Sequence, residues 1–343
     1  MSGNNSTENS TSSGEWTFAL KVTTYAHIGY TVQGCVQIWA NLLIVLAIYL
    51  NPKLRRNKDY YIPGGLALCD IAMGLGNFSG GIRRLVLIFT GHHNDLVTPW
   101  FCALTFPTFW WVWSGYAANA VMLLISIDRC IACYNPLLYM KIRGRILLKE
   151  CAAIFVASFI MTMVKYVEAF FANRQGLHSK LCYLAVAFNA RLFRFLLHWH
   201  VFTGIASVLI YILALCFMYC KHKGVASELM RKNRDRQIKV TKMLVLVVMM
   251  TFVLQTIPMA ARSLFYSMDA SFIIILNPVI WAVISTNYLN NIVIYVWKNK
   301  DIRQSIWSLL KFQSPGVTAV YPSKPYESSA MHKRTNLTTD VKN

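Results

Sequence analysis

The stretch WFCALTFPTFWWVWSGYAANAVMLLISIDRCIACY, residues 100–134, contains no Asp, Glu, Lys or Arg before Asp128. The hydrocarbon core of a bilayer is roughly 30 Å thick, and about 20 apolar residues in an α-helix cross it with every backbone hydrogen bond made inside the helix. This stretch exceeds that length. It therefore predicts a helix that spans a membrane.

Six further apolar stretches accompany it along the chain. They lie at about residues 25–50, 60–89, 146–172, 189–220, 238–268 and 272–297. Hydrophobic residues make up 56% of the 343 residues, and charged residues only 14%, whereas soluble domains carry about 25% charged residues. The sequence therefore predicts an all-α membrane protein, a seven-transmembrane helix bundle over residues 25–297.

Basic residues concentrate in alternate connections between these stretches. They fill the loops near residues 53–58, 141–149 and 221–242, and the region after Trp297. Because loops rich in Lys and Arg stay on the cytoplasmic side, we expect a multi-pass protein of the plasma membrane with its N-terminus outside and its C-terminus in the cytoplasm. The net charge of +20 fits contact with anionic membrane lipid better than a nucleic-acid partner, since it is spread over several short loops.

The two ends of the chain are polar. Residues 1–24 have neither a basic start nor an apolar segment, so no cleaved signal peptide is expected. They carry N-x-S/T sequons at Asn4, Asn5 and Asn9, which predict an extracellular glycosylated tail unless the sequons are chance products of a Ser/Thr/Asn-rich composition. Residues 313–343 contain three prolines and little apolar content, and predict a disordered cytoplasmic tail.

An acidic and a basic residue stand side by side at the cytoplasmic end of the third stretch. The run SIDRCIACYNPLLY, residues 126–139, resembles the D-R-Y-x-x-x-x-x-P-L-x-Y signature of rhodopsin-like G protein-coupled receptors. Asp128 can hold Arg129 in one pose until a partner competes for the guanidinium. Taken alone, the pair could equally be an ordinary interfacial arginine that snorkels toward water.

Other parts of the chain match the same family in the same order. They are Asn41 in the first stretch, LALCD at residues 66–70, Phe252 and Pro258 in the sixth stretch, NIVIY at residues 291–295, and an amphipathic segment at 302–307. The resemblance covers residues 25–311 and is strongest to the nematode serpentine chemoreceptor families, Srsx type. It implies a short amphipathic eighth helix over residues 298–312.

The resemblance also implies a function. A receptor of this kind binds an extracellular ligand, here a chemosensory cue or a peptide, and activates a heterotrimeric G protein. The residues that the resemblance assigns to signalling are Asp128, Arg129, Tyr211, Asn291 and Tyr295. A transporter or channel is the alternative, although the repeated halves and the several intramembrane charges typical of those classes are not read in this sequence. No motif of an intramembrane enzyme is read either, so no enzymatic activity is expected.

Several positions depart from the family pattern. Cys130 replaces the Tyr of the D-R-Y motif, Thr256 stands where the sixth helix usually has Trp, and Ile292 replaces the Pro of the seventh helix. Ile238 stands at a position where some members carry an acid that binds the arginine of the third helix. A contact that locks Arg129 to the sixth helix is therefore not expected.

Asp70 is the acid expected near the middle of the membrane. A buried charge there must be paired, hydrated or neutral. The resemblance implies a sodium ion bound by Asp70, with Ser114 and Asn287 as further ligands; otherwise no cofactor is expected. The alternative is a hydrogen-bonded cluster of Asp70 with Asn41 and Asn291.

Two of the nine cysteines are expected at the outer face, Cys102 and Cys182. Outer loops lie in an oxidising compartment, so a disulfide between them is allowed and would hold the second outer loop over the mouth of the bundle. The other seven are expected to be free thiols.

The outer halves of the helices carry more basic than acidic residues. Trp111 occupies the place where amine receptors carry an Asp, so an amine ligand is not expected. Arg83, Arg84, Lys165, Arg191, Arg194 and Arg262 favour an anionic ligand. The residues predicted to line the ligand site are Trp111, Gly115, Arg191, Arg194, Arg262 and Trp281.

Two alternatives compete with this anionic site. Lys165 and Glu168, three residues apart, could simply pair, and Arg191 and Arg194, which share a helix face, could reach lipid headgroups instead of clamping a carboxylate. His198 and His200 lie on different faces of the fifth helix, so no metal site is expected there.

Overall fold

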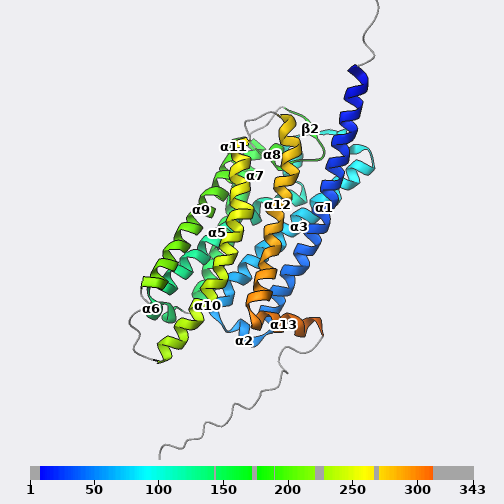
Figure 1. The fold of residues 1–343 in the computed structure, drawn as a ribbon. Coiled ribbons are helices and arrows are strands. Elements are labelled where there is room, and N and C mark those ends of the chain that lie inside the picture. Colours follow the sequence, from blue (N-terminus) through cyan, green and yellow to red (C-terminus); the bar gives the residue numbers. More distant parts are fainter. Residues whose placement is uncertain are drawn as a thin grey trace, which may run out of the picture.

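The computed structural model describes residues 8–142, 144–171, 176–188, 190–220, 228–265 and 270–311. Long helices run side by side and form one bundle (Figure 1). The helices of the bundle are α1 (Glu8–Leu50), α3 (Tyr61–Phe89), α5 (Phe106–Tyr134), α7 (Gly144–Phe171), α9 (Ala190–Cys220), the series α10 (Glu228–Thr251), η3 (Phe252–Thr256) and α11 (Ile257–Phe265), and α12 (Ala270–Lys298). The predicted all-α bundle of seven helices is confirmed.

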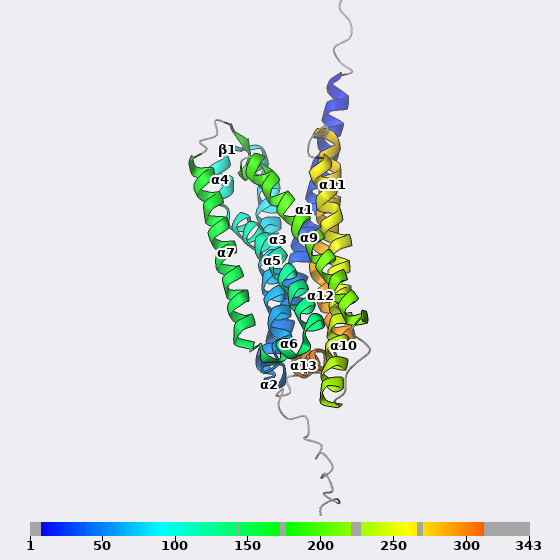
Figure 2. The ribbon, with the colours of Figure 1, turned by 90° about the vertical axis from the view of Figure 1, so that its left-hand side faces the viewer.

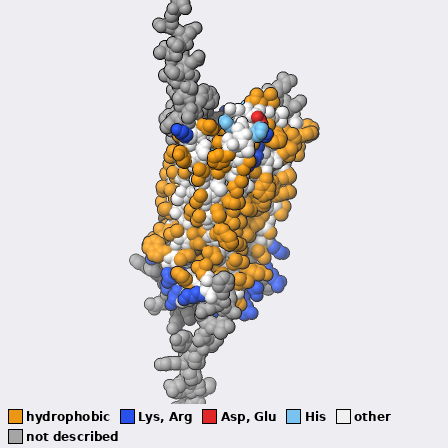
Figure 3. Space-filling model, turned by 90° about the vertical axis from the view of Figure 1, so that its right-hand side faces the viewer, with side chains coloured by type: hydrophobic (Ala, Val, Ile, Leu, Met, Phe, Trp, Pro, Cys, Tyr) orange, Lys and Arg blue, Asp and Glu red, His pale blue; other side chains and the backbone are white. Residues whose placement is uncertain are grey.

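Within the described residues, six helical spans are long and apolar enough to cross a membrane by themselves: Leu20–Leu50, Phe106–Tyr134, Gly144–Phe171, Arg191–Cys220, Gln237–Leu264 and Val279–Lys298. The seventh helix of the bundle, α3, is 29 residues long but carries six glycines and several polar residues. Its Asp70 and Asn77 are buried, so this helix turns its polar residues toward its neighbours. Figure 3 shows the result, a broad apolar belt with Lys and Arg side chains gathered mainly below it.

Short elements close the two ends of the bundle (Figures 1 and 2). At the end that carries the basic side chains lie α2 (Pro52–Arg55), η1 (Lys58–Tyr60), α6 (Pro136–Lys141) and α13 (Lys300–Leu310). At the opposite end lie η2 (His92–Asn94), β1 (Leu96–Val97), α4 (Pro99–Ala103), β2 (His178–Ser179) and α8 (Leu184–Ala187). The short helix α13 is the expected amphipathic eighth helix, and the side chain of Asn299 caps it by accepting from the backbone N–H groups of Asp301 and Ile302.

Two helix boundaries differ from those predicted. The third stretch is not one helix from residue 100 to 134, because it breaks between α4 and α5. Pro107 lies in the first turn of α5, where its missing N–H costs nothing, and Thr105 before it has extended backbone angles. The first helix begins at Glu8, well before the predicted start at residue 25.

The sixth helix contains a π-helical turn, η3. Pro258 is the second residue after this turn. A proline inside a helix has no N–H to donate, and its ring collides with the carbonyl four residues earlier. In the wider turn, Ile257 N–H donates to Phe252 O, and the carbonyl that the proline ring would otherwise meet has room. Residues 252–258 are therefore a weak point of the helix.

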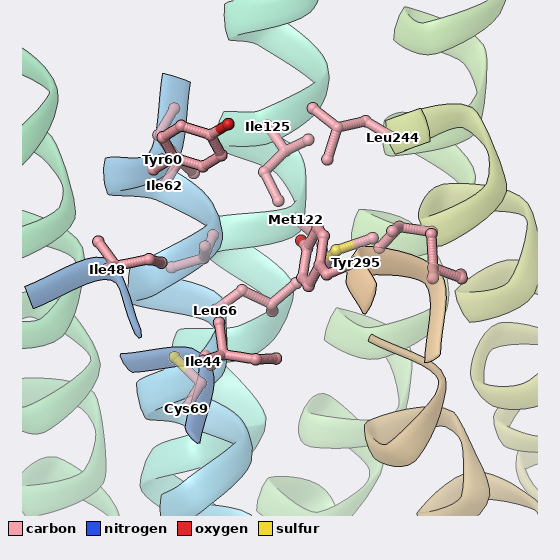
Figure 4. Close-up of a cluster of buried hydrophobic side chains, with 14 of the residues drawn as sticks. Ile44, Ile48, Tyr60, Ile62, Leu66, Cys69, Met122, Ile125, Leu244 and Tyr295 are labelled. Carbon is pink, nitrogen blue, oxygen red and sulfur yellow. The ribbon is translucent and has the colours of Figure 1, made fainter. Parts of the chain in front are cut away.

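Buried side chains form two main apolar clusters. The cluster nearer the basic end includes Leu66, Met122 and Tyr295 from α3, α5 and α12, whose side chains point toward one another in Figure 4. The cluster nearer the opposite end includes Cys102 and Phe193. Buried polar residues accompany the two clusters inside the bundle.

Candidate functional site

Arg129 is held in a buried polar cluster at the basic end of the bundle. Its side chain is 2% exposed, and its Nε donates to Asp128 Oδ2 at 2.8 Å, while Nη2 contacts the same oxygen. Nη2 also donates to the hydroxyl of Tyr139 at 2.7 Å. The structure thus brings together the pair that the sequence singled out, and their role in signalling stays a prediction.

A second acid, which sequence reasoning missed, completes this cluster. Asp59 in η1 places Oδ1 3.6 Å from Arg129 Nη2 and accepts a hydrogen bond from the Tyr139 hydroxyl at 3.1 Å. Burial raises the pKa of Tyr139, so this hydroxyl remains a donor. Lys58 fixes the position of Tyr139, since its Nζ donates to the Tyr139 carbonyl and lies 3.8 Å from the centre of the ring.

Arg129 also contacts the sixth helix, contrary to the expectation from Ile238. Nη1 of Arg129 donates to Gln237 Oε1 at 2.9 Å. The neighbouring residue supplies the contact, and a neutral amide replaces the acid. A hydrogen bond of this type has less Coulomb energy than an ion pair, so the contact between α5 and α10 is weaker than a salt bridge to an acid at this position would be.

A cavity of about 1260 Å³ opens beside this cluster. Asp59, Tyr139 and Gln237 line it together with Cys133 and Asn299. Its walls come from η1, α5, α6, α10 and the start of α13, so any displacement of α10 changes its width. The polar groups that hold Arg129 therefore border a space large enough to admit part of another protein.

Polar side chains form a chain across the middle of the bundle. Asn119 Nδ2 on α5 donates to His200 Nδ1 on α9 at 2.6 Å, and Gln255 Nε2 on η3 donates to the same nitrogen at 3.4 Å. Asn287 Nδ2 on α12 donates to Gln255 Oε1 at 3.0 Å. Sequence reasoning missed this chain, although polar residues at these positions in apolar helices were a visible signal.

Asp70 lies next to this chain. Asn291 Nδ2 donates to Asp70 Oδ2 at 2.5 Å, whereas Asn41 donates to the carbonyls of Gln37 and Tyr288, so only part of the alternative cluster forms. Among the described residues, Asp70 Oδ1, Asn287 Oδ1 and Asn41 Oδ1 are buried without a hydrogen-bond partner. The Ser114 hydroxyl instead donates to the Trp110 carbonyl at 2.5 Å. Sodium binding stays a prediction.

The other two predicted signalling residues, Tyr211 and Tyr295, both belong to the apolar cluster nearer the basic end. Tyr211 on α9 donates its hydroxyl to the carbonyl of Thr241 on α10 at 2.7 Å, which ties the fifth helix to the sixth. Tyr295 on α12 is fully buried, and its hydroxyl has no partner in the part of the chain that the structure describes.

The outer loop after α7 lies over the opposite end of the bundle. The predicted disulfide between Cys102 and Cys182 is confirmed. Arg84 adds two hydrogen bonds to the same segment, from Nε to the Leu181 carbonyl at 2.9 Å and from Nη2 to the Cys182 carbonyl at 2.8 Å. Arg83 donates to the Lys180 carbonyl at 2.9 Å. These two arginines therefore anchor the loop, which is a use that the sequence did not suggest.

The antiparallel pair β1 and β2 continues this cap. Lys180 donates to Asp95 at 3.1 Å, and this hydrogen bond lowers the pKa of the Asp95 carboxyl. Asp95 therefore stays ionised at pH values below the usual carboxyl range, and the pair is lost only as the pH falls through that lowered value.

The residues predicted to line a ligand site do not all face inward. Arg191 and Arg194 are exposed, because the buried face of α9 is formed by residues such as Phe193, Leu197 and His200. The predicted clamp for one carboxylate is therefore wrong. His198 is exposed as well, on a face away from His200.

The remaining predicted residues do lie within the bundle. The guanidinium of Arg262 lies 5.1 Å from the ring centres of both Phe193 and Trp281. Trp111 donates to Asn77 Oδ1 at 2.9 Å. A Cβ at Gly115 would come 3.2 Å from His200 Nε2, so this glycine makes room for the histidine.

Comparison with known proteins identifies one family. The model of the family described as serpentine type 7TM GPCR chemoreceptor Srsx matches residues 34–310. The match runs from α1 to the end of α13 and so includes the Arg129 cluster, the chain of polar side chains and the disulfide. No curated protein matches the chain.

Proposed function

Because the chain belongs to the Srsx family of serpentine seven-transmembrane chemoreceptors, which are G protein-coupled receptors, we propose that it binds an extracellular ligand and activates a heterotrimeric G protein. The observation that carries the proposal is the buried Arg129 beside the cavity at the basic end. A guanidinium in this position can change partners when another protein enters the cavity. The G protein is the partner in question.

The contacts of Arg129 suggest how the inactive state is held. Asp128, Asp59 and Tyr139 together satisfy the guanidinium, and Gln237 links it to α10. Removing a single partner from such a buried cluster is costly. The state shown in the structure is therefore stable until α10 moves and another protein supplies new acceptors.

The sixth helix supplies the movement. Pro258 and the π-helical turn η3 weaken the helix near its middle. Gln255 lies in this turn and joins the chain of polar side chains to Asn287. A ligand that displaces α11 can thus bend the helix at η3, pull Gln237 from Arg129 and widen the cavity.

The orientation follows from charge. Lys and Arg side chains gather at the end that contains the cavity (Figure 3). The tendency of basic loops to remain in the cytoplasm assigns this end to the inner face of the plasma membrane, where G proteins are found. The disulfide end then faces outward. The predicted sequons Asn4 and Asn5 and the side chain of Asn9 lie outside the described residues.

Ligand-independent signalling tests this proposal. Asp128→Asn removes a counter-charge from Arg129 and should raise nucleotide exchange on a co-expressed G protein above the wild-type level. The double variant Asp128→Asn/Arg129→Ala should return exchange to the background level. Both measurements are made at equal surface expression.

The comparison of these two variants decides the outcome. Equal exchange in the single and the double variant, across representatives of each G protein class, would show that Arg129 does not contact a G protein and would overturn the proposal. Exposed Lys149, on the same side of the bundle, provides the control variant Lys149→Gln, which should leave exchange unchanged.

A further inference from the structure

Lys165 is a charged residue buried in the outer half of the bundle. Its side chain on α7 is 2% exposed. Among the described residues, its Nζ donates one hydrogen bond, to the carbonyl of Leu192 on α9 at 3.0 Å. It lies 5.0 Å from the centre of the Tyr116 ring and 5.9 Å from that of Phe188. An ammonium group has three donors, so two of them remain for another acceptor.

The pairing of Lys165 with Glu168 that the sequence allowed does not form. Within the described residues, no carboxylate lies within 4.0 Å of the Lys165 ammonium. Glu168 is three residues further along α7 and half-buried. A buried ammonium that forms no close ion pair is expensive in an apolar environment, even with Glu168 one turn away, and it marks a place where an anion from outside would be stabilised.

Other polar groups around the ammonium also lack partners. The hydroxyls of Tyr116 and Tyr166 and the indole N–H of Trp199 are buried and have no hydrogen-bond partner among the described residues. Tyr116 is 3% exposed, its ring faces the Lys165 ammonium, and it lies 6.4 Å from the Trp199 ring. All three orphaned groups can donate a hydrogen bond, which is the property that an anion requires.

The walls of this region indicate the rest of the ligand. The rings of Tyr116 and Phe188 lie nearest the ammonium. Trp199 packs against Tyr116, and Tyr166 packs against Phe188. Arg262 on α11 lies against two further aromatic rings, those of Phe193 and Trp281. A single buried ammonium with orphaned hydroxyl donors suits one negative charge shared by two oxygens, attached to an apolar body, better than a doubly charged phosphate.

We propose that Lys165 binds the carboxylate of a small organic acid whose apolar part packs against these aromatic rings. One oxygen accepts from the Lys165 ammonium, and the Tyr116 hydroxyl donates to the carboxylate. The site lies beside the chain of polar side chains, because Gly115 and Asn119 on the same helix as Tyr116 contact His200. This inference rests on the proposed receptor function and specifies its ligand class.

The test uses hexanoate, decanoate, benzoate and phenylacetate, each compared with its primary amide. G protein activation is measured on the wild type, Lys165→Met and Lys165→Arg at equal surface expression. At least one acid should activate the wild type while its amide does not. Lys165→Met should reduce the potency of that acid about ten-fold to a hundred-fold, the loss expected for one charge-assisted hydrogen bond, and Lys165→Arg should retain most of it.

Tyr116→Phe separates a binding role from a packing role, since it removes only the hydroxyl. It should lower the potency of the acid without lowering surface expression. Lys149 lies on an exposed turn of α7, the helix that carries Lys165. Lys149→Met is the control and should leave potency unchanged.

Binding is measured separately from coupling, by the thermal unfolding midpoint of the purified receptor. The active acid should raise the midpoint of the wild type and not that of Lys165→Met. If no acid activates or stabilises the wild type, or if Lys165→Met responds as the wild type does, the carboxylate site is rejected. The proposed receptor function survives that result whenever Asp128→Asn still signals through Arg129, so the two failures are distinguishable.

Discussion

At the scale of single residues, Arg129 has two acids where the family signature supplies one. Asp128 precedes it in the chain. Asp59 in η1 contacts Arg129 directly and also accepts a hydrogen bond from the Tyr139 hydroxyl. Asp128, Asp59 and Tyr139 bind one guanidinium that is itself 2% exposed, so each hydrogen bond to the charge contributes more than it would at the surface. The inactive pose of Arg129 therefore depends on a residue 70 positions away in the sequence.

This arrangement predicts that Asp59 restrains signalling as Asp128 does. Asp59→Asn should shift the equilibrium toward the active state by about ten-fold or more, since a hydrogen bond to a charged group contributes roughly 1.5–3 kcal/mol. Tyr139→Phe should give a smaller increase, because it removes the bridging hydroxyl and leaves both carboxylates. Basal nucleotide exchange on the G protein measures both.

Asp301 provides the matched control for the loss of a carboxylate. It lines the same cavity and is exposed, so Asp301→Asn should leave basal exchange near the wild-type level. An Asp59→Asn receptor with wild-type basal exchange would show that the second acid does not restrain Arg129.

At the scale of helices, the fifth and sixth helices approach closely at η3. A Cβ added to Gly204 would come 2.1 Å from Thr256 Oγ1 and 2.7 Å from Thr256 Cγ2. Thr256 stands where related receptors usually carry Trp, and the short side chain lets η3 lie against the glycine backbone. The departure from the family pattern at residue 256 thus has a packing reason in α9.

Gly204→Ala should therefore destabilise the bundle by about 1–3 kcal/mol, the usual cost of an extra methyl group in a packed interior. The thermal unfolding midpoint of the purified receptor measures this. Adding Thr256→Ala should restore part of the loss, because the hydroxyl and methyl groups that collide are gone.

Gly29→Ala is the control: a Cβ there meets nothing within 4 Å, so removing the helical glycine should leave stability unchanged or slightly raised. Equal midpoints for the two alanine variants would contradict this account of the α9 contact.

The sequence predicted where the helices lie far better than which way they face. Long apolar runs give the spans directly, and the break before α5 was visible in Pro107. The orientation of α9 was not visible, because nearly all of its residues are apolar and the periodic contrast that reveals a buried face is weak. Arg191 and Arg194 were predicted to line the ligand site and are exposed instead. The alternative that Lys165 pairs with Glu168 does not form, because the Lys165 ammonium reaches the Leu192 carbonyl on α9.

Long-range polar contacts were the other part that the sequence could not give. Asp128 and Arg129 are adjacent, so their pairing can be read from the chain. The contacts of Arg129 with Asp59 and Gln237 join residues far apart in sequence, and no local pattern marks them. They arise only when α5, η1 and α10 pack together at one end of the bundle.

At the scale of the whole molecule, two caps of different kinds close the bundle. The inner cap is the set of hydrogen bonds around Arg129. Helix α10 joins it through the hydrogen bond from Arg129 to Gln237 and separates from it when that bond breaks. The outer cap is covalent: the disulfide joins Cys102 in α4 to Cys182, 80 residues along the chain. Arg84 on α3 adds two hydrogen bonds to the same segment. The outer end is thus held by a covalent bond and by hydrogen bonds, whereas the inner end is held by hydrogen bonds and ion pairs alone.

The outer cap predicts equal effects for its two cysteines. Cys102→Ser and Cys182→Ser should each lower surface delivery and destabilise the receptor, by about 2–5 kcal/mol if this disulfide resembles others that close long loops. The double variant should be no worse than either single one, because each substitution already removes the whole bond.

Cys216→Ser, at an exposed free thiol, is the control and should have little effect. Alkylation of both Cys102 and Cys182 in the folded, unreduced receptor would contradict the disulfide. Retention of the cap in the single variants would instead mean that Arg84 suffices to hold it, and Arg84→Gln in the Cys182→Ser background should then release it.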